Sequence, residues 1–122
     1  MSCGMRPRET EPAAVLLYTV WPDEASCLAV AEDLVAKGEV ACVNLLGPVT
    51  SVYAWQGRIE RGQEIAALFK TRGPLARSVC AAIAARHPYE VPAILALDVR
   101  QEGSFAPYLD WVAGQTGRST PE

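Results

Sequence analysis

The sequence predicts an α+β domain in which the elements follow one another as β-α-β-β-α-β, with a short helix at the C-terminal end. Two observations predict this order: apolar runs rich in strand formers alternate with segments of helical periodicity, and two long strand-like segments are joined by a tight turn. The length of 122 residues suits one domain. We expect the domain over 13–116, with disordered tails at 1–12 and 117–122.

The first strand and the first helix are expected before residue 38. Residues 13–20 (AAVLLYTV) form a short apolar run that is typical of a strand buried on both faces. Trp21 and Pro22 end the run, and Asp23 suits the N-cap of a helix over 24–37. Gly38 suits its C-terminal end. The apolar residues of this helix recur at helical spacing: Cys27, Val30, Ala31, Leu34 and Val35.

The middle of the chain predicts one long β-hairpin. Residues 40–56 are too long for an average strand, and Gly47-Pro48 predicts a kink or bulge within them. Gln56-Gly57-Arg58 predicts the tight turn, and 59–71 the returning strand. We also expect a bulge at Arg61-Gly62.

The last third predicts a second helix, a fourth strand and a short third helix. Gly73-Pro74 opens the second helix and Pro88 ends it. Residues 91–100 (VPAILALDVR) are expected as a strand, and Phe105 to Val112 as the last helix. The complete order is the ferredoxin-like, split βαβ arrangement, with two helices on one face of a four-stranded antiparallel sheet.

This arrangement leaves one face of the sheet without a helix, although the strands are apolar on both sides. The long hairpin also overhangs the sheet and leaves open edges. Exposed strand edges and apolar faces favour pairing with other chains. We therefore expect a homo-oligomer, with a number of subunits that this argument does not give.

Composition excludes several classes of partner. The formal net charge is −3, and no run of Lys or Arg offers a site for nucleic acid or anionic lipid. No apolar stretch approaches the ~20 residues of a membrane span, and the N-terminus lacks the apolar segment of a secretory signal. We expect a cytoplasmic protein with reduced cysteines. No phosphate-binding loop, G-x-S-x-G or H-E-x-x-H pattern is present, so we expect no enzyme.

Six segments resemble the CutA divalent-cation-tolerance family in order and spacing, within 15–112. They are P-D-E at 22–24, V-A-C-V-N at 40–44, S-V-Y-A-W-Q-G at 51–57, Glu64 with Lys70-Thr71, H-P-Y-E-V-P at 87–92, and Y-L-D-W at 108–111. The resemblance implies a homotrimer with an architecture similar to the PII signalling proteins. It also implies an association with tolerance to divalent metals, copper especially, and binding of copper or another divalent ion.

The alternative function is a PII-like trimer that serves as a signalling or scaffold protein and binds a small ligand or partner in clefts between subunits. Residues Tyr53, Trp55, Glu64, Lys70 and Tyr89 would line such a cleft. For the aromatic residues, packing against a neighbouring subunit is the simpler interpretation. For Glu64 and Lys70, the simpler interpretation is a structural role, either solvated or in an ion pair. A trimer without any ligand is the third hypothesis.

Cys42 and His87 are the candidate metal ligands. A thiolate suits Cu(I), and a neutral imidazole suits copper or zinc. The simpler interpretations are a small buried hydrophobe for Cys42 and a helix-capping role for His87. Some family members carry a cysteine in the first strand and a histidine pair before the proline. This chain has Tyr18-Thr19 and Arg86 there, and a guanidinium does not coordinate cations.

Overall fold

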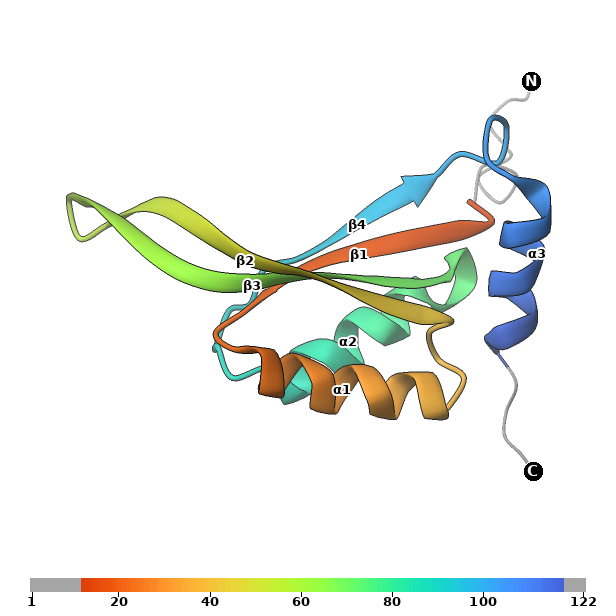
Figure 1. The fold of residues 1–122 in the computed structure, drawn as a ribbon, viewed down its shortest axis with the longest axis horizontal. Coiled ribbons are helices and arrows are strands. Elements are labelled where there is room, and N and C mark those ends of the chain that lie inside the picture. Colours follow the sequence, from red (N-terminus) through yellow and green to blue (C-terminus); the bar gives the residue numbers. More distant parts are fainter. Residues whose placement is uncertain (1–11, 118–122) are drawn as a thin grey trace, which may run out of the picture.

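The computed structural model describes residues 12–117, and it has the predicted fold (Figure 1). The strands are β1 (Ala14–Trp21), β2 (Cys42–Trp55), β3 (Arg58–Arg72) and β4 (Ile94–Val99), and the helices are α1 (Glu24–Ala36), α2 (Ala76–Arg86) and α3 (Ala106–Gln115). A 3₁₀ turn, η3 (Gly73–Leu75), precedes α2. Residues 1–11 and 118–122, and hence most of both predicted tails, lie outside the described residues.

The four strands form one antiparallel sheet in the order β2-β3-β1-β4. Helices α1 and α2 cover one face, which we call the core face, and α3 stands at the end of the sheet away from the hairpin (Figure 1). We call the other face the open face. The ferredoxin-like arrangement predicted from the sequence is therefore confirmed. No helix in residues 12–117 is long and apolar enough to cross a membrane.

Local sequence signals set both ends of α1. The Asp23 side chain accepts a hydrogen bond from the Ser26 backbone N–H at 2.8 Å, which is the N-cap geometry. At the other end, the N–H groups of Gly38 and Glu39 donate to the carbonyls of Val35 and Leu34. These bonds satisfy carbonyls that would otherwise have no partner at the helix end.

The hydrophobic core lies between the core face and the two helices. It joins Leu17 and Trp21 of β1 and Phe69 of β3 to apolar residues of α1 and α2. The indole N–H of Trp21 donates to the Thr19 hydroxyl at 2.7 Å, and that hydroxyl donates to the Ala67 carbonyl at 2.9 Å. The buried polar groups of Trp21 and Thr19 thus both have partners, as buried polar groups require.

The sequence predicted β1 to be buried on both faces, and in the single chain this is only partly so. Val15, Leu17, Thr19 and Trp21, which point into the core, are fully buried, whereas Leu16, Tyr18 and Val20 on the open face are half-buried. The difference arises because helices cover only one side of the sheet.

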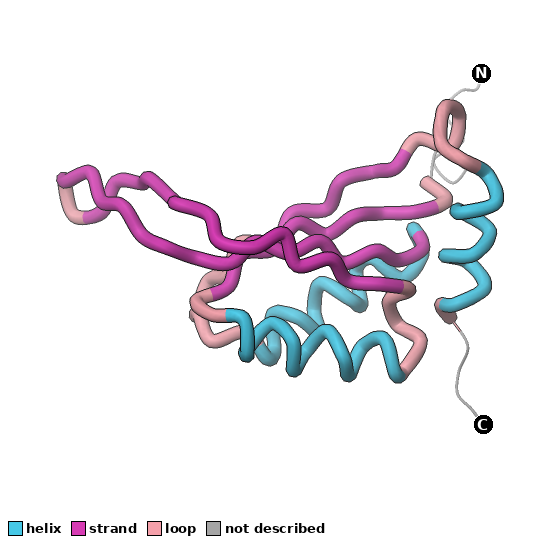
Figure 2. Tube along the Cα trace, viewed as in Figure 1, coloured by secondary structure: helices cyan, strands magenta, loops and turns pink. Residues whose placement is uncertain are grey.

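The hairpin extends well beyond the rest of the sheet (Figure 2). Strand β3 pairs with β1 as far as Ile65, which lies opposite Trp21, and from there to the tip it pairs only with β2. We call residues 49–64 the arm. Its tip is a two-residue turn in which Gln56 and Gly57 both have positive φ, at 50° and 78°. This geometry matches the twist of a tight hairpin.

Two details of the strands differ from the prediction. The bulge lies at Leu45/Gly47, and pairing runs without interruption through Arg61 and Gly62, so the second predicted bulge was wrong. A Cβ at Gly62 would lie 3.6 Å from the Tyr53 hydroxyl, an ordinary contact distance, so the packing there does not require a glycine. Strand β4 begins at Ile94 and not at residue 91, since Pro92 has no N–H to donate to a strand.

Candidate functional site

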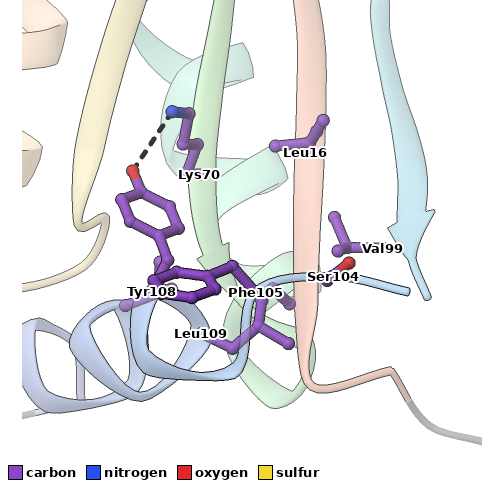
Figure 3. Close-up of a pocket in the computed structure, with 9 residues that line it drawn as sticks. Leu16, Lys70, Val99, Ser104, Phe105, Tyr108 and Leu109 are labelled. Carbon is purple, nitrogen blue, oxygen red and sulfur yellow. Dashed lines mark hydrogen bonds between the residues drawn. The ribbon is translucent and has the colours of Figure 1, made fainter. Parts of the chain in front are cut away.

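A cavity of about 330 Å³ lies between α3 and the open face of the sheet (Figure 3). We call it the α3 pocket. Its lining is largely apolar and comes from β1, β3, β4, α3 and the two residues just before α3: Ala14, Leu16, Lys70, Val99, Ser104, Phe105, Tyr108, Leu109 and Val112. The pocket forms where α3 crosses the end of the sheet, with Val112 and Leu109 packed against the small apolar cluster at the ends of the strands.

Lys70 brings the one cationic group into this lining. Its ammonium donates to the Tyr108 hydroxyl at 3.2 Å and lies 5.2 Å from the centre of that ring. Figure 3 shows the lysine chain reaching from β3 toward the tyrosine on α3. Within residues 12–117 no carboxylate pairs with this ammonium. The pocket therefore offers an apolar volume with a cation and a hydroxyl at one side.

Cys42 lies next to this pocket, at the start of β2. It pairs with Lys70 across the strands and is half-buried on the open face. It packs with the small cluster of Ala14, Ala41 and Val112. The thiol thus has contact with both apolar side chains and solvent in the single chain.

His87 lies near the opposite end of the sheet and is buried. Its ring stacks on Trp21 with 4.2 Å between centroids. Its Nε2 lies 2.7 Å from the Val20 carbonyl, to which it donates, and its Nδ1 accepts from the Tyr89 backbone N–H at 3.1 Å. Both nitrogens are therefore engaged, and metal binding through either would break a hydrogen bond. The geometry counts against His87 as a ligand.

Glu64 and Tyr89 meet where the arm leaves the sheet. The Tyr89 hydroxyl donates to the Glu64 carboxylate at 2.8 Å. Partial burial, followed by the bond to this carboxylate and its negative charge, raises the pKa of Tyr89 to about 12. The pair acts as a clasp between the base of the arm and the segment that follows α2.

The structure divides the predicted cleft residues into three places. Lys70 lies in the α3 pocket, whereas Glu64 lies six residues away along β3, a distance of about 20 Å along a strand. Trp55 lies at the arm tip with 59% of its surface exposed. Only Tyr53, Glu64 and Tyr89 lie in one region, since Tyr53 is close enough to contribute to the raised pKa of Tyr89. A single chain therefore does not assemble the predicted cleft.

The candidate metal ligands are also apart. Cys42 aligns with Leu16 through Lys70, and His87 contacts Val20, so the two residues lie toward opposite ends of β1. In the described part of the chain no three His, Cys, Asp or Glu residues are grouped so that they could hold an ion. The donor set of one chain does not fit a closed metal site, which needs about four ligands.

The remaining special residues have structural roles. Arg86, in the place of a possible family ligand, forms an ion pair with Asp33 at 2.7 Å and so joins α2 to α1. Lys37 and then Arg86 lower the pKa of Asp33. Burial, followed by the nearby Glu24 carboxylate, raises the pKa of the Cys27 thiol to about 11, so that thiol remains protonated and serves as core.

The α3 pocket has little signature in the sequence. Tyr108 belongs to the Y-L-D-W motif, and Ser104 and Phe105 lie outside every motif that predicts a site. The one available signal was the pair of exposed aromatic residues Tyr108 and Trp111 on a short helix. The cavity itself depends on how α3 docks, and no sequence pattern encodes that angle.

Comparison with known proteins gives one consistent result. Residues 15–115 match the family described as "CutA1 divalent ion tolerance protein". The chain is 40% identical over 103 residues to the divalent-cation tolerance protein CutA of Thermus thermophilus, covering 84% of this chain and 97% of that protein. It is 34% identical over 123 residues to human protein CutA, covering 92% and 68% respectively.

Solved structures agree with this. The structure of divalent ion tolerance protein CutA1 from Ehrlichia chaffeensis superimposes with a TM-score of 0.81 at 29% identity, covering 89% of this chain and 100% of that one. The structure of CutA1 from the psychrotrophic bacterium Shewanella sp. SIB1 gives 0.82 at 29% identity, covering 88% and 99%. The likeness therefore extends over the whole described fold.

Proposed function

Because the chain belongs to the CutA1 divalent ion tolerance protein family, we propose that it acts in cellular tolerance to divalent cations, as a cytoplasmic homotrimer that catalyses no reaction. The observation that carries this proposal is the family match over nearly the whole described fold, residues 15–115. The named relatives are named for cation tolerance or simply CutA, so the alternative of a PII-like signalling protein is not favoured.

The open face of the sheet supports assembly. Apart from Lys70 near α3, its side chains on β1, β3 and β4 are largely apolar, and no described helix covers them except at the α3 end (Figure 1). Leu95 and Leu97 on β4 are 60% and 48% exposed. Burial of apolar surface stabilises association by roughly 25 cal/mol per Å². Packing of identical chains against this face would remove it from water.

We propose that the ion is cargo held between subunits, and that Cys42 is the residue that contacts a soft ion such as Cu(I). The thiol is accessible on the open face, where assembly would bring copies together. The ammonium on Lys70, across the strands from Cys42, repels cations. We therefore expect binding to be weak, which suits tolerance to an excess of metal better than a resident cofactor.

The test combines mass measurement with metal titration. Light scattering of the purified protein should give three times the chain mass. Calorimetric titration of reduced protein with Cu(I), Cu(II) and Zn(II) should show binding of at least one ion, and Cys42→Ser should weaken Cu(I) binding at least tenfold.

Two matched variants serve as controls. Cys80→Ser removes a half-buried thiol on α2 and should leave binding unchanged. His87→Gln should affect stability more than affinity. If no ion binds, or if Cys42→Ser leaves every affinity unchanged, the assignment of the ion to Cys42 fails. A monomeric mass would overturn the trimer.

A further inference from the structure

The arm tip and helix α3 lie at opposite ends of the long axis of the molecule (Figure 1), and α3 lines the α3 pocket. We propose that Trp55 at the arm tip of one copy fills the α3 pocket of the next copy, against Lys70 and Tyr108. This inference rests on the proposed homotrimer and names the contact that closes it.

The arm exposes more apolar surface than its own chain can bury. Tyr53 and Trp55 lie on one face of the arm and are half exposed. Val52 and Ile59, on the other face, are 65% and 75% exposed. In this region β2 and β3 pair only with each other. An isolated two-stranded hairpin is at best marginally stable in water, so the arm requires an external surface to pack on.

The α3 pocket offers such a surface. Its volume of about 330 Å³ is at the lower end of the range for small-molecule sites, which is a size that one large aromatic side chain suits. The walls are apolar, from Leu16, Val99 and Leu109, and Phe105 stands exposed at the mouth. Filling the pocket would remove these walls from water.

The chemistry of the pocket selects the aromatic face of the arm. A lysine ammonium is attracted to the face of an aromatic ring, and tryptophan is the strongest partner of this kind. An indole N–H also needs an acceptor when it is buried, and the hydroxyls of Tyr108 and Ser104 line the pocket. The aliphatic face, with Val52 and Ile59, would gain nothing from the cation.

The position of the two features explains why the contact must join different chains. The arm leaves the sheet at the end opposite α3, so a chain cannot place its own Trp55 in its own pocket (Figures 1 and 2). A contact between one end of a chain and the other end of its neighbour is heterologous, and such contacts close into rings when the rotation permits. A closed ring has one arm for every pocket, which leaves neither feature unsatisfied.

This arrangement also unites residues that the single chain keeps apart. Trp55 and Lys70 both belong to the predicted cleft, yet one lies at the arm tip and the other at the α3 end. With the arm seated, the two would meet across the subunit boundary.

Site-specific photo-crosslinking tests the contact directly. Benzoylphenylalanine is placed at position 55, and a matched control carries it at position 52 on the opposite face of the arm. Chains with and without heavy isotopes are mixed, so that mass spectrometry identifies links between chains. Position 55 should link to the 104–112 segment or to Leu16 of another chain, and position 52 should not.

The outcomes separate this inference from the proposed function. A trimer whose position-55 links fall elsewhere overturns the seating of Trp55 and leaves the trimer intact. Protein that is monomeric by light scattering overturns both. A pocket filled by a small molecule is a third case. If octanoate binds the assembled wild-type protein and Tyr108→Ala abolishes the binding, the pocket is open and the inference is overturned.

A double-mutant cycle supplies a second measurement. Trp55→Ala and Tyr108→Ala should each raise the concentration at which the trimer half-dissociates by tenfold or more. In the double variant this concentration should be little higher than in the weaker of the two single variants, since each substitution removes the same contact. Ile59→Ala, on the other face of the arm, should combine additively with Tyr108→Ala. Additive effects of Trp55→Ala and Tyr108→Ala would overturn the inference.

Discussion

The two faces of the sheet are built from the same strands but differ in what completes them. On the core face Trp21 is fully buried, stacks on His87, and donates its N–H to Thr19. Trp55, farther along the hairpin, is 59% exposed at the arm tip. Both tryptophans are the last residue of their strand, Trp21 of β1 and Trp55 of β2, so their position in the strand does not explain the difference. The chain therefore covers the core face with its own helices, whereas the open face and the arm keep apolar side chains that only another molecule can cover.

The largest expected effect lies on the core face. Phe69 is fully buried and its ring lies 6.1 Å from that of Trp21. Phe69→Ala should lower the free energy of unfolding by about 3–5 kcal/mol, since it removes a large buried side chain and leaves a cavity. Urea denaturation at fixed protein concentration measures this. A change below about 1 kcal/mol would mean that the core face is not where the stability resides.

On the open face a charge should separate the chains without unfolding them. Leu68 lies across the strands from Tyr18 near the middle of this face. Leu68→Glu should convert the assembly to smaller species in light scattering, because a charge buried in an interface has a large desolvation cost. The far-ultraviolet circular dichroism should stay native.

A matched control places the same charge on an exposed position of α2. Ala85→Glu should leave the mass of the assembly unchanged. If Leu68→Glu stays fully assembled, the open face is not the interface. If it unfolds, the distinction between the two faces fails.

The Thr19 hydroxyl allows the indole N–H of Trp21 to be buried, and its removal should have a smaller effect. Thr19→Val keeps the shape of the side chain but removes the hydroxyl that accepts from the Trp21 indole and donates to Ala67. Leaving the indole N–H without a partner should lower the free energy of unfolding by about 1–3 kcal/mol. Val20→Thr, at the neighbouring position on the open face, serves as the control and should cost less.

The smallest expected effect concerns the clasp at the base of the arm. The pKa of Tyr89 is raised to about 12 from the ordinary value of about 10. The folded state therefore holds this proton more tightly. The resulting stabilisation is complete below pH 10 and is lost as the pH rises toward 12. Tyr89→Phe should flatten the fall in stability across this window.

Titration of tyrosine absorbance locates the group directly. Glu64→Gln should shift the titration of Tyr89 back toward the ordinary pKa, because it removes the negative charge that accepts the hydrogen bond. Glu60→Gln, farther along the same strand, should leave the titration unchanged. An unchanged titration in Glu64→Gln would show that the clasp does not form in solution.

Local sequence signals were sufficient for the elements and their order. Asp23 and Gly38 mark the ends of α1, Gln56-Gly57 marks the hairpin turn, and Pro88 follows α2, because each of these residues acts on its own neighbours in the chain. The errors were also local. Arg61-Gly62 does not form a bulge, since the two residues pair in regular register with Val52 and Ser51 of the opposite strand.

The predicted sites fared differently, because a site depends on contacts between distant segments. The motif pattern placed Lys70, Trp55 and Glu64 in one cleft, but in the single chain they lie at the α3 end, the arm tip and the arm base. Cys42 and His87 were predicted as metal ligands from the chemistry of their side chains alone. In the structure, however, both nitrogens of His87 are already hydrogen-bonded, one to the Val20 carbonyl and the other to the Tyr89 N–H.

Periodicity, turn residues and motif spacing are local properties of the chain, and they were enough to predict the order of strands and helices, the long hairpin and the family. The pocket that α3 leaves beside Lys70, the stacking of His87 on Trp21, and the distance of Trp55 from its own domain became apparent only in the folded chain. These depend on the angles and registers at which distant elements meet, and such angles result from the packing of many side chains together.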